Sequence, residues 1–379
     1  MSNANVAQLV GQRVLVTALA ESADAAIAGD TLRLEPMAFP DPATLAPDDV
    51  VIRVESAAVG WVDLIMASGQ YQHLVTPPYT PGIEYAGTAA WVGPAAAGTV
   101  SIGDAVIVDG LQAGPRSKGA HQRWGGFATW AVAPARALVP KPAALDFDQA
   151  SSVFGNYETA YHGLITRGRL AAPDTVVIHG ASGSTGLAAV QIAKRVGATV
   201  IATGRSDEKL AKVRAEGADH VINIRDAASE TGVRRFRDDI KALTGGRGAD
   251  VVYDGVGGAV GQESLRCLRF GGRYLVIGWA STPNVAVGRG ERGAPNANQL
   301  PTNLIMMKSL EVLGCPVALA TFEDPSLGPP RRKQILAWVE AGLLRPQVSH
   351  RFPLSEFRAA MRAKWQGEVV GACVLTPSG

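Results

Sequence analysis

The residues best suited to chemistry lie in one glycine-rich stretch, residues 175–186, which reads Thr-Val-Val-Ile-His-Gly-Ala-Ser-Gly-Ser-Thr-Gly. Its apolar start predicts a buried strand, and the apolar spacing that begins at Leu187 predicts a helix directly after it. Small residues let the backbone approach a ligand closely, and the start of a helix attracts an anion. We therefore predict that an anion such as a dinucleotide pyrophosphate binds at Ser182, Gly183, Ser184 and Thr185.

A second predicted strand, residues 199–203, follows after one helix, as a βαβ unit requires. The stretch departs from the common Gly-x-Gly-x-x-Gly motif because Ala181 replaces its first glycine. Sites that prefer NAD usually carry an acid at the tip of the second strand, where it binds the ribose 2′-hydroxyl. Here the tip offers cations and a hydroxyl, which favours NADPH, although the same residues also fit the solvated start of an ordinary helix. These residues are Gly204, Arg205, Ser206 and Lys209.

Strands and helices alternate through the middle of the chain, which predicts an α/β fold with a doubly wound parallel sheet. The predicted strands are residues 175–179, 199–203, 219–222, 250–253 and 273–278, and the predicted helices are residues 184–196, 207–216, 229–243 and 258–269. Ligands of such sheets bind at the carboxyl ends of the strands, so the glycine-rich stretch lies at the binding edge.

The first 110 residues instead predict a β-rich, barrel-like domain of short strands separated by turns. The expected strands are residues 13–17, 31–36, 50–59, 85–92 and 105–109, with a short helix at 62–68 and a loop at 111–124. A helical segment is expected at residues 147–166. After the alternating region we expect a helix from residue 303, a strand at 310–314, a helix at 330–341 and a βαβ-like tail at 348–375.

Composition argues against several classes of function. The 379 residues carry a formal net charge of +2, with no long block of like charge, which argues against binding to nucleic acid or to a membrane surface. The three cysteines are far apart in apolar segments, so they predict neither a disulfide framework nor a zinc site. We expect no secretory signal and no membrane-spanning run, which leaves the reducing cytoplasm as the default compartment.

The order of these parts resembles the medium-chain dehydrogenase/reductase superfamily, and within it the zinc-independent quinone oxidoreductase branch that includes zeta-crystallin. The resemblance covers nearly the whole chain and rests on residues 81–87, 125–128, 156–161, 179–191, 254–258 and 271–274. It implies a GroES-like catalytic domain at residues 1–150 and 342–379, and a Rossmann NADPH-binding domain at residues 151–341. It also implies a homodimer formed through the strand at residues 310–314.

The resemblance allows the zinc question to be asked of particular residues. Alcohol dehydrogenases of this superfamily hold a catalytic zinc with Cys-x-x-Asp and with Gly-His-Glu about twenty residues later. The matching stretches here are Gly60-Trp61-Val62-Asp63 and Gly82-Ile83-Glu84, so glycine and isoleucine stand where the ligands would be. Without a Lewis acid to stabilise an alkoxide, the chemistry left is hydride transfer from NADPH to a quinone or an α,β-unsaturated carbonyl.

The resemblance also implies roles for individual residues. Tyr71 lies in a block on the substrate side, where its phenol can donate to the acceptor oxygen, although a packing role is also open. Asn156 and Tyr157 belong to a block beside the nicotinamide. Asp63 is expected to cap the short helix, and His162 and His179 are expected to be structural. Further cofactor contacts are expected from Thr159, Val256, Ile277, Gly278 and Asn303.

Two other functions stay open. Arg289 and Arg292, in a long loop at residues 284–301, can bind the phosphates of an acyl-CoA, which would indicate an enoyl-thioester reductase. Many relatives carry polar residues where Gly60 and Ile65 stand, and their loss is compatible with a protein that binds NADPH with little turnover. Oxidation of NADPH by a small panel of acceptors separates these functions.

Overall fold

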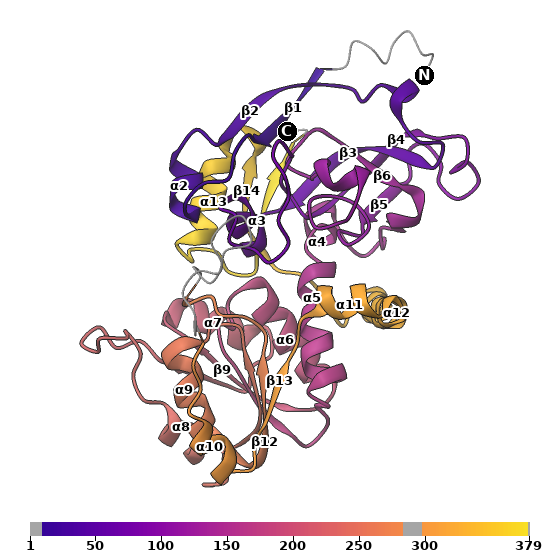
Figure 1. Ribbon diagram of the computed structural model, residues 1–379. Helices are drawn as coiled ribbons and strands as arrows, with labels where there is room; N and C mark the ends of the chain where they lie inside the picture. The colour runs from indigo at the N-terminus through magenta and orange to yellow at the C-terminus, as the bar shows by residue number, and fades with distance from the viewer. Residues whose placement is uncertain (1–9, 283–297, 378–379) are drawn as a thin grey trace. The chain divides into compact units, whose positions relative to one another are not determined.

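The computed structural model describes residues 10–282 and 298–377, which are drawn in Figure 1. They fall into two compact units. Residues 10–154 and 348–377 form the first, which we call the β-rich unit, and residues 155–282 and 298–347 form the second, the α/β unit. Arg289 and Arg292 lie outside the described residues.

A seven-stranded, mostly antiparallel sheet forms the centre of the β-rich unit, with the order β14-β15-β3-β4-β5-β7 and with β6 paired to β3. Strands β1 and β2 form a separate antiparallel pair. The strands are β1 (Val10–Val16), β2 (Leu32–Ala38), β3 (Asp49–Ala58), β4 (Glu84–Val92), β5 (Ala105–Val108), β6 (Trp130–Pro134), β7 (Leu138–Pro140), β14 (Val348–Pro353) and β15 (Ala372–Thr376). The helices are α2 (Ala23–Ala28), α3 (Trp61–Ala67), α4 (Phe147–Ala150) and α13 (Phe357–Trp365).

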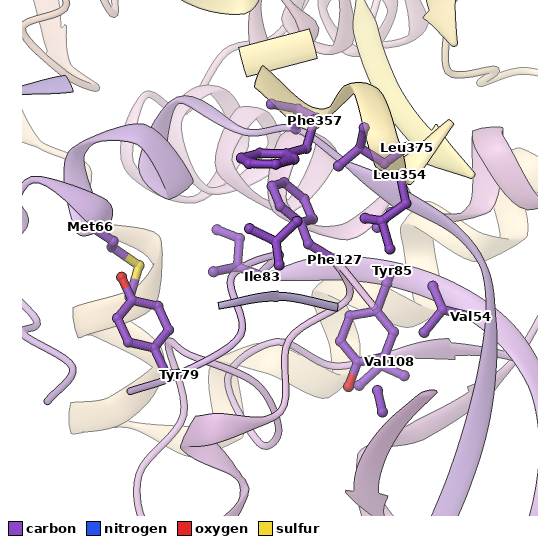
Figure 2. Packing of buried hydrophobic residues seen from close by; sticks show 14 of the residues in the cluster. Val54, Met66, Tyr79, Ile83, Tyr85, Val108, Phe127, Leu354, Phe357 and Leu375 are labelled. Carbon is purple, nitrogen blue, oxygen red and sulfur yellow. The ribbon is translucent and has the colours of Figure 1, made fainter. Parts of the chain in front are cut away.

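The core of this unit joins segments that are far apart in the sequence. Phe127, Ile83 and Phe357 belong to one buried cluster with Leu354 and Leu375 (Figure 2). Each such side chain contributes about 1.5–3 kcal/mol on burial. Because Ile83 belongs to Gly82-Ile83-Glu84, this packing fixes one of the two stretches compared above with metal-binding segments.

The α/β unit contains a six-stranded sheet in which every pairing is parallel, in the order β10-β9-β8-β11-β12-β13. Counted along the chain, this is the order 3-2-1-4-5-6 of dinucleotide-binding sheets, which confirms the predicted fold class. The strands are β8 (Thr175–Ile178), β9 (Thr199–Gly204), β10 (His220–Asn223), β11 (Ala249–Asp254), β12 (Leu268–Val276) and β13 (Glu311–Gly314). The helices are α5 (Phe154–Tyr161), α6 (Ser184–Arg195), α7 (Asp207–Ala215), α8 (Arg237–Leu243), α9 (Gly258–Cys267), α10 (Thr302–Met307), α11 (Val317–Glu323) and α12 (Gly328–Glu340).

Helices α8, α9 and α10 gather on one side of this sheet (Figure 1). Ile240 of α8 and Leu265 of α9 share a buried cluster with Val177 and Val252 of the central strands, and Leu304 of α10 packs against that cluster. The apolar residues of β8 and β11 are buried, as expected for strands covered on both faces. The sheet therefore offers ligands its carboxyl edge rather than a face.

Three predicted elements differ from the structure. The helix expected from residue 229 begins only at Arg237, because Ser229 and Thr231 bond each other and the carbonyl of Val233 in a turn. The helix expected over residues 147–166 is interrupted after Ala150 and ends in a π-helical turn at residues 162–167. Strand β12 begins at residue 268, where the sequence predicted the end of a helix. Short helices α2 and α11 were not predicted.

Candidate active site

The turn between β8 and α6 places the predicted anion-binding residues at the carboxyl edge of the sheet. Gly183 is the N-cap of α6, a helix of 12 residues, and it brings no side chain to the N–H groups of the first turn. A Cβ added at Gly186 would lie 2.3 Å from the carbonyl oxygen of Gly180, so the helix and the turn meet backbone to backbone. This close cradle fits a pyrophosphate at a helix start.

The buried imidazole of His179 connects the turn to β9 and to α9. His179 Nδ1 lies 2.7 Å from Thr203 Oγ1 at the end of β9, and His179 Nε2 lies 2.7 Å from Ser264 Oγ in α9. Burial lowers the pKa of His179, so the ring is neutral and its two nitrogens are shared with two hydroxyls. His179 is therefore structural, in keeping with the sequence-based expectation.

The turn after β9 carries the residues predicted to select NADPH. Arg205 is exposed, and the hydroxyl of Ser206 accepts the N–H of Lys209 at 3.4 Å as the N-cap of α7. Asp207 accepts a hydrogen bond from Asn223 at 2.9 Å, so this acid is engaged with the end of β10. Ser206 therefore serves the helix start, as the alternative interpretation expected, while two cations stand at the strand tip.

The turns after β11 and β12 carry Val256, Ile277 and Gly278, and one residue connects them. The N–H of Val256 donates to the carboxylate of Asp254 at 2.7 Å, and the N–H of Ile277 donates to the carbonyl of Asp254 at 2.9 Å. Val256, Ile277 and Gly278 were predicted from the family resemblance, whereas the role of Asp254 was not predicted. Its available signal was an acid at the last position of a buried strand.

Helix α5 carries the remaining candidate residues, and they differ in how close they lie to the glycine-rich turn. Asn156 Oδ1 accepts the hydroxyl of Thr185 at 3.0 Å, which places Asn156 at the start of α6. Thr159 donates its hydroxyl to the carbonyl of Gly155 at 2.6 Å. The hydroxyl of Tyr157 donates at 2.7 Å to Gln191, two turns further along α6 and about 10 Å from its first residue. The structure thus brings Asn156, but not the Tyr157 hydroxyl, to the glycine-rich turn.

In the β-rich unit, Asp63 joins the two stretches that match metal-binding segments of alcohol dehydrogenases. Its Oδ2 accepts the N–H of Gly60 at 2.9 Å, which caps α3 as expected. Its Oδ1 accepts the N–H groups of Gly82 and Ile83 at 3.0 and 3.1 Å. Burial raises the pKa of Asp63 to about 6, although these hydrogen bonds favour the carboxylate. The carboxyl group therefore links the two stretches, and we call these three hydrogen bonds the Asp63 clasp.

Tyr71 lies in the same unit and is 9% exposed within its apolar core. This burial accounts for Tyr71 as a packing residue, and its role as a donor stays a prediction. A groove of about 370 Å³ opens in the β-rich unit between two loops, residues 75–79 and 119–123. Arg123 lies on this groove and stacks over the ring of Trp124, with the guanidinium carbon 5.1 Å from the ring centroid.

Comparison with known proteins decides the family. An alcohol dehydrogenase GroES-like domain matches residues 46–143, and a zinc-binding dehydrogenase domain matches residues 184–326. The quinone oxidoreductase-like protein 2 homolog of Nematostella vectensis is 31% identical over 333 residues, which cover 87% of this chain and 82% of that protein. The chain belongs to the quinone oxidoreductase branch of the medium-chain dehydrogenase/reductase superfamily.

Solved structures share the fold of this chain over nearly its whole length. A probable oxidoreductase from Mycobacterium abscessus superposes with a TM-score of 0.77 at 27% identity, over 97% of this chain and 99% of that one. A mycobacterial protein complexed with NADPH superposes with a TM-score of 0.76 at 24% identity, over 97% of this chain and 100% of that one. As a member of this superfamily, the chain is an oxidoreductase that uses a nicotinamide cofactor.

The last cofactor candidate, Asn303, lies on helix α10. Asn303 is exposed on α10, which packs against α9. Lys308, directly after α10, donates to carbonyls at the end of α9, including that of Leu265 at 3.0 Å. Because α9 starts at the carboxyl edge of the sheet and ends at the amino edge, α10 leads away from the glycine-rich turn. The turns after β8, β9, β11 and β12 share the carboxyl edge, and a cofactor contact of Asn303 stays a prediction.

The described residues carry neither a metal-binding cluster nor a membrane-spanning helix. In residues 10–282 and 298–377, no cluster of three or more His, Cys, Asp or Glu side chains has an arrangement that could hold a metal ion. Over the same residues, every helix is too short or too polar to cross a membrane.

Proposed function

We propose that this protein is a zinc-independent oxidoreductase that transfers hydride from NADPH to a quinone or an α,β-unsaturated carbonyl, as a homodimer. The observation that carries the proposal is the Asp63 clasp. It holds together the stretches of Gly60 and Ile83, two residues without ligand atoms in their side chains, where alcohol dehydrogenases of the superfamily carry metal ligands. An acceptor that spreads the incoming charge over its own carbonyl needs no such metal.

Bound NADPH would supply the hydride. The cradle between Gly180 and Gly186 binds the pyrophosphate, and Asn156 orients the hydroxyl of Thr185 at the start of α6. The turns at Val256 and Ile277 line the nicotinamide side. Tyr71 is the candidate donor of a hydrogen bond to the acceptor oxygen, which stabilises the charge that develops there.

The choice of NADPH over NADH is supported by the tip of β9. Arg205 and Lys209 flank Ser206, and Asp207 is turned to Asn223. A 2′-phosphate would meet two cations at this position, whereas a 2′-hydroxyl would find no carboxylate at the strand tip itself.

The homodimer is supported by the edge of the six-stranded sheet. Among the described residues, β13 pairs only with β12. Val312 on β13 and Phe270 on β12 are exposed, as is Met306 beside them on α10. An exposed apolar edge strand is a template for pairing with a second copy. Light scattering should give the mass of a dimer for the wild type and of a monomer for Val312→Lys.

The deciding experiment follows the loss of reduced-nicotinamide absorbance with a panel of quinones, enals and enones, with crotonyl-CoA as the thioester. NADH and a zinc chelator serve as controls. Turnover with NADPH that survives chelation supports the proposal, and a clear preference for crotonyl-CoA would replace it with an enoyl-thioester reductase. Tight NADPH binding without turnover on any acceptor would identify a cofactor-binding protein instead.

A further inference from the structure

Asp254 holds two neighbouring turns at the carboxyl edge of the α/β sheet. Its side chain is fully buried, and Oδ1 accepts the N–H groups of Val256 and Gly257 at 2.7 and 3.0 Å. Its backbone carbonyl accepts the N–H groups of Ile277 and Gly278 at 2.9 and 3.3 Å. One residue thus bonds four backbone N–H groups from two turns that follow adjacent parallel strands.

The second carboxylate oxygen of Asp254 is also committed. It accepts the hydroxyl of Tyr274, a fully buried residue of β12. A Cβ added at Gly261 would lie 2.6 Å from that hydroxyl and 3.1 Å from the carboxylate, so α9 passes the pair at a distance that only glycine permits. Asn298 closes the arrangement by accepting the N–H of Gly258 at 3.3 Å. The carboxylate is therefore held by two backbone N–H groups and one phenol hydroxyl, with Gly261 of α9 packed against it.

We infer that Asp254, held by Tyr274, is the positioning residue that fixes the turns at Val256 and Ile277 against each other for the nicotinamide end of the cofactor. This inference rests on the proposed function, because it assigns those turns to the nicotinamide. Asp254 touches neither cofactor nor substrate. Its carboxylate acts on the turn after β11 through the N–H groups of Val256 and Gly257, and on β12 through the hydroxyl of Tyr274. Its backbone carbonyl adds the bonds to Ile277 and Gly278, which continue the pairing of β11 with β12.

The position of Asp254 allows its effect on nicotinamide binding to be distinguished from a general loss of folding stability. The adenosine half of the cofactor is assigned to the turns after β8 and β9, which Asp254 does not bond. Loosening the turn after β11 therefore changes how the nicotinamide is held. It reaches the turn after β8 only where the side chain of Val256 lies against Gly180, and it leaves the turn after β9 intact. A residue that only stabilised the fold would weaken both halves together.

The test compares NADPH with adenosine 2′,5′-bisphosphate, which carries only the adenosine half. Asp254→Asn replaces one carboxylate oxygen with an NH₂ group. One of the groups that donate a hydrogen bond to Asp254 therefore loses its acceptor. We expect kcat/KM for NADPH to fall about 10-fold or more, because small misplacements of a reacting group are costly. The dissociation constant of adenosine 2′,5′-bisphosphate, measured by calorimetry, should change less than about twofold. Tyr274→Phe should also lower kcat/KM for NADPH, by a smaller factor.

Asp250→Asn is the matched control. Asp250 is also buried on the same strand, but it lies at the other end of β11 and bonds Arg247 and the N–H of Thr175. This variant should lose thermal stability and keep kcat/KM within about twofold of the wild type. If Asp254→Asn weakens the binding of NADPH and of adenosine 2′,5′-bisphosphate by the same factor, or changes neither, the inference is overturned.

The same design keeps the inference apart from the proposed function. A wild type that binds NADPH but reduces no acceptor overturns the function, and the two dissociation constants still decide the role of Asp254. A wild type that binds NADPH and adenosine 2′,5′-bisphosphate equally tightly has no nicotinamide contact to position and overturns the inference alone. A wild type that binds neither nucleotide overturns both.

Discussion

Asp63 in the β-rich unit and Asp254 in the α/β unit are both fully buried carboxylates that accept backbone N–H groups. Besides the N–H of Gly60, Asp63 accepts N–H groups 19 and 20 positions away. The N–H groups that the Asp254 carboxylate accepts belong to the turn that it begins, and its long-range partner is the hydroxyl of Tyr274. The N–H groups on Asp63 therefore close a long-range contact of the fold, and those on Asp254 shape a local turn at the binding edge. We expect the first to govern stability and the second to govern cofactor geometry.

The largest effect should come from removing the Asp63 clasp. Asp63→Ala leaves three N–H groups without their acceptor, two of them buried, and each buried group costs about 1–3 kcal/mol. We expect the free energy of unfolding, from urea denaturation, to fall by about 4 kcal/mol. The exposed pair of Asp48 and Arg136 offers a control, because Asp48→Ala should cost less than about 1 kcal/mol. A loss of NADPH affinity without a loss of stability would reverse the comparison.

The pH dependence of stability should carry the signature of the same residue. The pKa of Asp63 is raised from 3.8 to about 6 by burial, so the folded state holds the proton more tightly than the unfolded state does. The contribution of this group to stability is therefore fully present below about pH 4 and is lost as the pH rises through about 6, a change of about 3 kcal/mol. Asp63→Asn should lack this component when unfolding is compared at about pH 4 and about pH 7. An unchanged profile would mean that Asp63 does not titrate in this range.

At the tip of β9, the positive charges should affect the binding of NADPH but not that of NADH. The double variant Arg205→Gln, Lys209→Gln removes both cations from a 2′-phosphate, and we expect NADPH to bind about 30-fold more weakly, or about 2 kcal/mol. NADH binding should stay the same. Lys212→Gln serves as the control, since Lys212 is on the same helix and pairs with Glu208 at 3.2 Å. Equal weakening of both cofactors would contradict selection by the 2′-phosphate.

The smallest effect should come from Tyr157→Phe. The phenol donates to Gln191, which also bonds Glu216 at 2.8 Å, so its loss should lower the free energy of unfolding by about 1 kcal/mol. We expect kcat to change less than about twofold, because the hydroxyl lies two turns from the start of α6. Asn156→Ala, one residue earlier, should raise the KM for NADPH. A large fall in kcat for Tyr157→Phe would restore Tyr157 as a catalytic residue.

Local patterns predicted most of the α/β unit. The strand expected at residues 199–203 is β9, and the strand expected at 250–253 lies within β11, because β-branched runs bounded by glycine or polar residues favour buried strands. The helix expected at 229–243 starts late because hydroxyl groups in the turn compete with helical hydrogen bonds. Asn303 was placed by family resemblance, and the course of α10 depends on packing against α9.

The sequence by itself determined what depends on residue type and short spacing. This includes the alternation of strands and helices, the cradle of small residues before α6, the cations at the tip of β9, and the lack of ligand atoms at Gly60 and Ile83. Only the tertiary structure decided which polar groups meet. Tyr274 reaches Asp254, and Tyr157 reaches Gln191, because strand order and helix packing bring together residues 20 and 34 positions apart. Such pairings follow from the register of neighbouring elements, which local sequence does not encode.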